Sequence, residues 1–152
     1  MEGILKVLFI CRHNSGRSQM AEAFLRKFGG NRFDAESAGM EPADQVNPLV
    51  VEVMREEGID LSGKKPRSVM QMFRDGNLYS HVVTVCHEQE TQCPVFPGIT
   101  RRWHCPFPDP SAARGSREEQ LAFVRKIRDD IKRWILGVMD NGRDFKGFDP
   151  VS

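Results

Sequence analysis

One apolar run near the start of the chain constrains the fold more than any other feature. Residues 4–10, Ile-Leu-Lys-Val-Leu-Phe-Ile, have the length of a strand and lack the alternation of a half-exposed one. Such a run is typical of a central strand in a parallel sheet, buried on both faces. It ends at Cys11, and from Ser18 the apolar spacing becomes helical until Gly29 and Gly30. The first unit is therefore predicted to be a strand, a short polar loop and a helix.

The rest of the chain alternates strand-like and helix-like segments. Further strands are predicted at residues 33–38, 81–85 and 99–103. Helices are predicted from the N-cap Asn47 to Gly58, over residues 66–73, and from a capping box at 116–119 to Asn141 and Gly142. This alternation predicts an α/β fold: one domain over residues 1–152, with an open four-stranded parallel sheet and helices on both faces.

Charge and cysteine content exclude several classes of protein. The chain has 22 basic and 21 acidic residues, a net charge of +1, so its charge does not favour nucleic acid or a membrane surface as a partner. No apolar run approaches the roughly 18 residues of a membrane span, and the first residues do not read as a signal peptide. We expect a cytoplasmic monomer. Four cysteines are too few and too unevenly spaced for a secreted disulfide framework, which leaves catalytic, redox or metal roles.

The loop after the first strand carries the strongest functional pattern. It reads Cys-Arg-His-Asn-Ser-Gly-Arg-Ser over residues 11–18, and open α/β sheets bind ligands at this end of their strands. Backbone N–H groups, the dipole of the next helix and a guanidinium are expected to bind one tetrahedral oxyanion here. The residues with this predicted role are Arg12, His13, Asn14, Ser15, Gly16 and Arg17.

The same loop is predicted to hold a nucleophile. Its positive field is expected to lower the pKa of the Cys11 thiol, and the Ser18 hydroxyl is placed to hydrogen-bond the thiolate. Gly16 is expected to allow the turn. A structural interpretation stays open, with Cys11 as a buried strand-end thiol and Arg17 as a solvated helix residue. His13 either lowers the pKa of Cys11 or faces the solvent.

Residues 7–22, from the end of the first strand into the first helix, resemble the phosphate-binding loop of the low-molecular-weight protein tyrosine phosphatases, and the resemblance covers most of the chain. It implies that family's fold, with the phosphate-binding loop after the first strand. Asp109-Pro110 looks like the family's late Asp-Pro loop, in which the aspartic acid protonates the leaving group. An Asp-Pro pair is also an ordinary turn.

Two further cysteines resemble the redox segment of the thioredoxin-coupled arsenate reductases, which share this fold. Cys86 ends a predicted strand and Cys93 follows seven positions later, an arrangement that suits stepwise thiol–disulfide exchange. The resemblance implies that Cys11 attacks arsenate, Asp109 protonates the departing hydroxide, and Cys86 attacks Cys11 to expel arsenite. Cys93 then captures Cys86, and thioredoxin reduces the resulting disulfide. The thiols supply the electrons, so no cofactor is expected.

The chain differs from some thioredoxin-coupled arsenate reductases at positions that bear on the predicted site. Some have another cysteine at the position of Gly16, which the relay does not need. Some bind potassium, for which Asn14, Glu22 and Ser37 could match, but basic residues at 64–67 stand where an acidic ligand is expected. No metal is therefore predicted. Cys105 has no part in the relay and is expected to be a structural thiol.

Three other functions remain open. An ordinary phosphatase shares Cys11, Arg17 and Asp109, but the tyrosines common beside its Asp-Pro are absent, and phosphate and sulfate are expected as competing anions. A zinc module is disfavoured, because adjacent Cys-His pairs do not easily point at one metal. Its ligands would be Cys86, His87, Cys93, His104 and Cys105. A redox switch would form the same dithiol pair without arsenate turnover.

Overall fold

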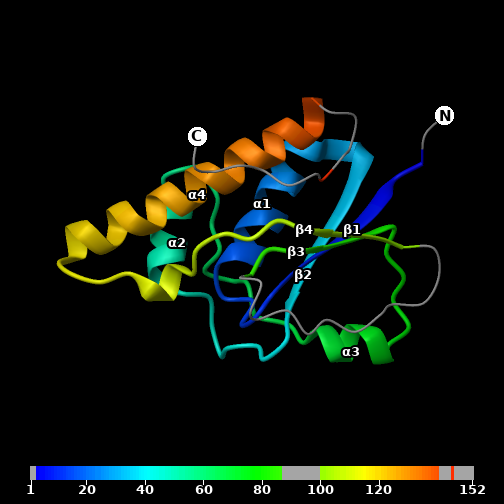
Figure 1. Ribbon diagram of the computed structural model, residues 1–152, viewed down its shortest axis with the longest axis horizontal. Coiled ribbons are helices and arrows are strands. Elements are labelled where there is room, and N and C mark those ends of the chain that lie inside the picture. Colours follow the sequence, from blue (N-terminus) through cyan, green and yellow to red (C-terminus); the bar gives the residue numbers. More distant parts are fainter. Residues whose placement is uncertain (1–2, 87–99, 141–144, 146–152) are drawn as a thin grey trace.

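The computed structural model describes residues 3–86, 100–140 and 145 (Figure 1). All four strands are parallel, in the spatial order β2-β1-β3-β4. Their bounds are Leu5–Cys11 for β1, Phe33–Gly39 for β2, His81–Thr84 for β3 and Arg101–His104 for β4. The predicted four-stranded parallel sheet is confirmed.

Helices cover both faces of the sheet, as predicted. They are α1 (Arg17–Gly29), α2 (Pro48–Arg55), α3 (Val69–Arg74) and α4 (Arg117–Asp140), with short 3-10 turns at Gly30–Arg32 and Pro110–Ala112. In Figure 1, α1, α2 and α4 lie on one side of the sheet and α3 lies on the other. Within the ranges given above, no helix combines the length and the apolar character that a membrane span requires.

The central strand β1 supplies both cores, which explains its continuous apolar sequence. Successive side chains of a strand point to opposite faces. Val7 and Phe9 enter the core beneath α1 and α4, where Phe9 meets the ring of Trp134 edge to face. Leu8 and Ile10 enter the smaller core beneath α3. A polar residue at any of these four positions would lie in one of the two cores.

Two predicted helix caps are confirmed. The Asn47 side chain accepts a hydrogen bond from Leu49 N at 2.9 Å at the start of α2. At the start of α4, Ser116 Oγ accepts from Glu119 N, and Glu119 Oε1 accepts from Ser116 N, each at 3.1 Å. These are the two reciprocal bonds of a capping box. The predicted end of α4 at Asn141 and Gly142 lies outside the described residues.

Two helix boundaries differ from the prediction. α2 ends at Arg55, and a turn follows that reaches Gly58 with a φ of +75°. α3 starts at Val69 instead of Pro66, because Ser68 caps it and the preceding backbone is used elsewhere. Arg67 O accepts from Gly39 N at 2.8 Å, and Arg67 N donates to the Asn14 side chain. An extended segment against the loop therefore replaces the first turn of the predicted helix.

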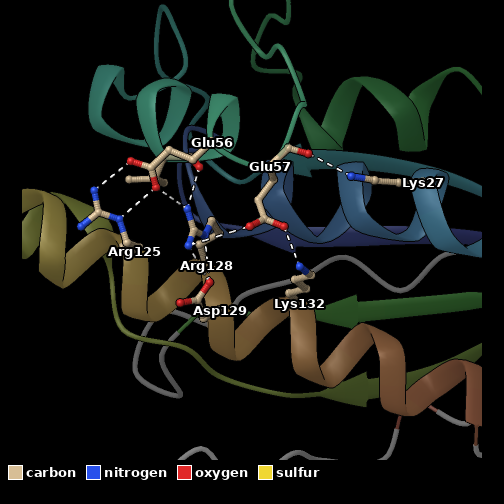
Figure 2. A network of polar contacts seen from close by, with 8 residues as sticks. Lys27, Glu56, Glu57, Arg125, Arg128, Asp129 and Lys132 are labelled. Carbon is tan, nitrogen blue, oxygen red and sulfur yellow. Dashed lines mark hydrogen bonds and ion pairs between the residues drawn. The ribbon is translucent and has the colours of Figure 1, made fainter.

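A charged network fastens the end of α2 to α4 (Figure 2). The buried Arg128 side chain donates to Val53 O at 2.9 Å and to Glu56 Oε1 at 2.7 Å. Lys132 Nζ lies 2.7 Å from Glu57 Oε1 in the same network. Since the other end of α2 borders the loop after β1, the network helps to hold one wall of the site.

Candidate active site

The loop that follows β1 directs its carbonyl groups outward. Those of residues 11, 12, 13 and 15 accept hydrogen bonds of 2.7 to 3.1 Å from the backbone N–H groups of residues 40, 41, 43 and 47. The Asn14 carbonyl accepts from the Gln19 side chain at 3.2 Å. The Gly16 carbonyl accepts from Met20 N within the first turn of α1. Every carbonyl of residues 11–16 is thereby engaged away from the loop's interior.

This arrangement leaves the amide groups for an anion. Across the described ranges, no backbone carbonyl accepts a hydrogen bond from the amides of residues 12, 13, 15 or 16. The N-terminus of α1 follows directly, and the helix dipole favours negative charge there. Converging amides at a helix N-terminus form an anion-binding site. The local geometry is therefore that of an oxyanion cradle, with Cys11 at its base.

Hydrogen bonds converge on the Cys11 sulfur, which is buried. Asn14 N donates to Sγ at 3.2 Å, and Ser18 Oγ lies 2.8 Å from it. These two contacts fix the position of the sulfur at the base of the loop. Cys11 is thus a buried thiol at the end of β1, as its structural interpretation predicted. Its surroundings also suit a nucleophile.

Asn14 braces the loop from inside, a role that the sequence did not indicate. Its φ of +52° makes it the one non-glycine residue with positive φ among those described. Its side chain is fully buried, donating to Ser18 Oγ at 2.7 Å and accepting from Arg67 N at 2.9 Å. The left-handed residue of the loop is thus Asn14, two positions before Gly16. At Gly16 the loop passes close to Pro110, since a Cβ there would lie 3.0 Å from Pro110 Cγ.

Arg17 and Asp109 face each other across the mouth of the cradle. Arg17 is buried, donates to Phe107 O at 3.2 Å, and has Nη2 3.7 Å from Asp109 Oδ2. A small pocket is lined by these two residues and by Cys11, His13, Ser15, Gly16, Asn47 and Pro110. The structure thus brings Asp109, 98 positions after Cys11 in the sequence, to the same pocket.

Asp109 carries opposing influences on its proton affinity. Partial burial raises the pKa of this carboxyl, but the hydrogen bond from Ser111 N and the charge of Arg17 outweigh it. The pKa of Asp109 is therefore held below its usual range. An anion in the pocket would counter the Arg17 charge and move this pKa upward.

The side chains of Arg12 and His13 lie at the rim. His13 Nδ1 is 2.9 Å from Glu41 O, and His13 is one of the residues that line the pocket. Arg12 is half exposed and has its Nε 3.5 Å from Glu41 Oε1. Arg12 therefore offers the cradle its backbone, whereas the imidazole of His13 is fixed at the entrance.

Cys86 lies at the carboxyl edge of the sheet beside Cys11. Ile10 pairs with Thr84, and Val85 N donates to Ile10 O at 2.9 Å. Cys86 is buried and belongs to the same core cluster as Cys11 and Cys105. Neighbouring parallel strands thus bring the first and second cysteines of the predicted relay to one edge. Cys93 lies outside the described residues.

Gly39 is a site residue that the sequence analysis missed. At the end of β2, a Cβ on this glycine would lie 2.8 Å from Asn14 N and 2.8 Å from the carbonyl carbon of His13. Only the absence of a side chain lets β2 pass so close to the loop. A glycine at the end of a predicted strand, adjacent to a ligand loop, was the available signal.

At the position where some relatives bind potassium, Lys64 lies beside Glu22. The buried Glu22 side chain accepts from Ser37 Oγ at 2.7 Å, and Lys64 Nζ lies 2.7 Å from Glu22 Oε2. Arg26 Nε is 3.0 Å from the same oxygen. The carboxylate is thus balanced by side chains of the protein.

The ligands proposed for a zinc module do not come together among the residues that the structure describes. In that part of the chain, no three His, Cys, Asp or Glu side chains gather closely enough to hold a metal ion. His104 Nδ1 instead lies 2.6 Å from Thr84 Oγ1. Two of the five proposed ligands, His87 and Cys93, fall outside the described residues.

A Cys-x5-Arg oxyanion loop after the first strand of a parallel sheet, with an aspartate over its mouth, defines a class of phosphate-loop enzymes. The family model described as low molecular weight phosphotyrosine protein phosphatase matches residues 6–142. The chain belongs to this family.

Within the family, the chain is similar to arsenate reductases. It is 38% identical over 138 residues to the arsenate reductase of Halalkalibacterium halodurans, covering 90% of this chain and 96% of that one. A solved arsenate reductase in the phosphate binding state has a TM-score of 0.75 at 26% identity, covering 91% and 98%. The thioredoxin-dependent arsenate reductase of Corynebacterium glutamicum has a TM-score of 0.66 at 26% identity, covering 92% and 62%.

Proposed function

We propose that the protein reduces arsenate to arsenite through a relay of Cys11, Cys86 and Cys93, and that thioredoxin returns the enzyme to its reduced state. We further propose that it acts as a cytoplasmic monomer. The arsenate reductases among its relatives support the reaction, and the relative named thioredoxin-dependent supports the reductant.

In the first step, Cys11 Sγ attacks arsenic and a hydroxide departs. The amides of the cradle and the Arg17 guanidinium stabilise the charge on the arsenate oxygens. Arg17 is suited to this because it is buried and held by Phe107 O, so little of its geometry has to be ordered on binding. Ser18 and Asn14 stabilise the attacking sulfur.

Asp109 donates the proton that lets the hydroxide leave as water. It lines the same pocket as Cys11 and faces Arg17. Arsenate brings negative charge beside Arg17, which raises the pKa of the Asp109 carboxyl from its lowered value and favours the protonated acid. Substrate binding thereby prepares the acid for its role.

In the second step, Cys86 attacks the Cys11 sulfur. The sulfur–arsenic bond breaks, its electron pair stays on arsenic, and arsenite leaves. Cys93 then attacks Cys86 and releases the Cys11 thiolate, leaving a Cys86–Cys93 disulfide for thioredoxin. The position of Cys86, just past the end of β3 and so beside the end of β1, is the single observation that carries the reductase proposal.

A second candidate function is hydrolysis of phosphate monoesters through a phosphorylated Cys11. The family match favours it, and the cradle and the acid are common to both reactions. Arsenate and phosphate have nearly the same shape and charge, so the cradle discriminates little between them. We therefore expect phosphate and sulfate to compete with arsenate. The two functions differ in their need for Cys86 and Cys93.

The test is NADPH oxidation with thioredoxin, thioredoxin reductase and arsenate, beside hydrolysis of an aryl phosphate. We expect Cys11→Ser to abolish both activities, and Cys86→Ser and Cys93→Ser to abolish only sustained arsenate reduction. Full reductase turnover in either of the last two variants would falsify the relay. Hydrolysis by the wild type without arsenate-dependent NADPH oxidation would leave the phosphatase as the function.

A further inference from the structure

The peptide between Asn14 and Ser15 is held differently from its neighbours in the loop. The carbonyl groups of residues 11, 12, 13 and 15 accept hydrogen bonds from main-chain amides within residues 40–47. The Asn14 carbonyl instead accepts from the side chain of Gln19, whose Nε2 lies 3.2 Å away. A side chain, and not the main chain, therefore fixes this peptide of the loop.

The orientation of this peptide decides where the Ser15 amide points. In a trans peptide, the C=O and the N–H point in opposite directions. Because the Asn14 carbonyl is turned toward Gln19, away from the interior of the loop, the Ser15 N–H is directed into the cradle. Among the described residues, no backbone carbonyl accepts a hydrogen bond from that N–H. Gln19 therefore controls one of the donors available to an oxyanion.

A second hydrogen bond from Gln19 fixes the Asn14 side chain. A backbone N–H can only donate, so the bond of 2.9 Å from Arg67 N identifies the atom it meets as Asn14 Oδ1. Gln19 Nε2 donates to the same oxygen at 3.1 Å. Asn14 Nδ2 consequently faces Ser18 Oγ at 2.7 Å, and Ser18 Oγ lies 2.8 Å from Cys11 Sγ. Gln19 thus supports both the peptide and the side chain of Asn14.

Gln19 holds this position at a cost to stability. Its side chain is 1% exposed, and its Oε1 has no hydrogen-bond partner within the described part of the chain. An unpaired buried acceptor destabilises a folded protein. An apolar side chain of the same length would fill the space without that cost. The two bonds that Nε2 donates to Asn14 are therefore the reason for a polar residue here.

We propose that Gln19 is a positioning residue for the oxyanion site, an inference that deepens the proposed function and rests on it. Gln19 holds the Asn14–Ser15 peptide so that the Ser15 N–H donates to an oxygen of bound arsenate or phosphate. Gln19 is not among the residues that line the pocket, so it acts through Asn14. Without its amide, the Asn14 carbonyl loses its partner and the peptide is free to turn the Ser15 N–H away from the anion.

The test replaces Gln19 with methionine, which has a similar length but no donor. We expect the Kd of inorganic phosphate, measured by isothermal titration calorimetry, to rise about tenfold, as when one hydrogen bond to a charged group is lost. The matched control is Gln120→Met. Gln120 Nε2 also donates to a carbonyl five residues earlier, Gly115 O at 2.9 Å, and neither residue lines the pocket. An equal change of Kd in the two variants would overturn the proposal.

A second measurement separates positioning from a general loss of structure. In the wild type, we expect saturating phosphate to shift the amide proton resonances of His13, Ser15 and Gly16 in proton–nitrogen NMR spectra. Gln19→Met should lose at least half of the Ser15 shift. It should keep the other two shifts, because main-chain bonds hold those peptides. A uniform loss at the three positions would overturn the proposal. If the methionine variant does not fold, Gln19→Leu provides the same comparison.

Arsenate-dependent NADPH oxidation by the wild type separates the failure of this inference from that of the proposed function. A wild type that neither turns over arsenate nor binds phosphate overturns both. Absent turnover with a selective loss at Ser15 in Gln19→Met overturns the reductase and supports the role of Gln19. Normal turnover by the wild type, with the Kd of Gln19→Met within twofold of the wild-type value, overturns the role of Gln19 alone.

Discussion

At the scale of single residues, the site depends on two side chains that are held before substrate binds. Arg17 is buried against Phe107 O, and Asp109 is fixed by Ser111 N at 2.9 Å. Groups fixed in advance need little reorganisation during the reaction. Their chemistry should therefore be sensitive to changes that conserve charge or shape.

Replacing Arg17 with lysine tests whether the planar guanidinium is needed. Lysine keeps the charge but loses the paired donors that match two oxygens of a tetrahedral anion. We expect kcat/KM for arsenate to fall about 10²- to 10³-fold, as when one preorganised donor is lost. Steady-state kinetics with the thioredoxin system measure it. A fall of less than threefold would contradict the bidentate role, and Arg12→Lys at the exposed rim is the matched control.

Replacing Asp109 with asparagine tests general acid catalysis. The effect should depend on the leaving group, because a good one departs without a proton. We expect kcat for phenyl phosphate to fall about 10²- to 10⁴-fold, the usual contribution of a positioned acid. The fall for p-nitrophenyl phosphate should be clearly smaller. Equal losses for both esters would show that Asp109 acts in some other way.

At the scale of elements, the cradle is built by segments that are distant in the sequence. The backbone N–H groups of residues 40, 41, 43 and 47 donate to the outward-facing carbonyl groups of the loop, and residues 67 and 68 complete the support through Arg67 and the pairing of Gly39 with Ser68. The loop after β1 is thus shaped mainly by its neighbours. A change in a neighbouring segment should therefore disturb the site.

Replacing Gly39 with alanine tests this dependence. The new Cβ would meet backbone atoms of Asn14 and His13 at 2.8 Å, and backbone cannot move aside as a side chain can. We expect a loss of stability of about 1 to 3 kcal/mol, with at least a tenfold loss of activity. Urea unfolding and the arsenate assay measure these. Gly63→Ala, which has no atom within 4 Å of its Cβ, should change neither, and equal effects would contradict the argument.

Sequence predicted the elements whose signals are local. The apolar run of β1, the capping pair Ser116 and Glu119, and the polar loop between β1 and α1 all depend on near neighbours. The start of α3 was wrong because Asn14, 53 residues away, binds the Arg67 amide. Gly39 was missed for the same reason, since its neighbour in space is distant in the sequence. The roles of Cys86 and Asp109 came from family resemblance, which spacing alone does not provide.

At the scale of the whole molecule, the network around Arg128 connects the outer helix α4 to the wall of the site (Figure 2). Replacing Arg128 with methionine leaves Val53 O without this donor and removes a short bond to Glu56. We expect a loss of about 2 kcal/mol, since charged hydrogen bonds contribute about 1.5 to 3 kcal/mol. Arg125→Met removes a more exposed partner of Glu56 and should cost clearly less stability than Arg128→Met. Urea unfolding of both variants decides whether burial sets the difference.

The same network makes stability depend on acid pH. Hydrogen bonds from Arg125 and Arg128 lower the pKa of Glu56 from 4.5 to about 2. The contribution of Glu56 is therefore fully present above pH 4.5 and is lost as the pH falls toward 2. We expect the stability difference between the wild type and Glu56→Gln to be constant from pH 7 to pH 5 and to shrink below that. A constant difference down to pH 2.5 in urea titrations would contradict this assignment.

The outward-facing carbonyl groups of the loop have an evolutionary consequence. Since main-chain bonds to residues 40–47 set the curvature of the loop, the side chains of Arg12, His13 and Ser15 are not what shapes it. Natural variation at these three positions can alter which anions enter the pocket. The backbone conformation that binds the tetrahedral group would stay the same. Diversification of this scaffold is therefore expected to accumulate at the entrance and to spare Asn14, Gly39 and Arg17.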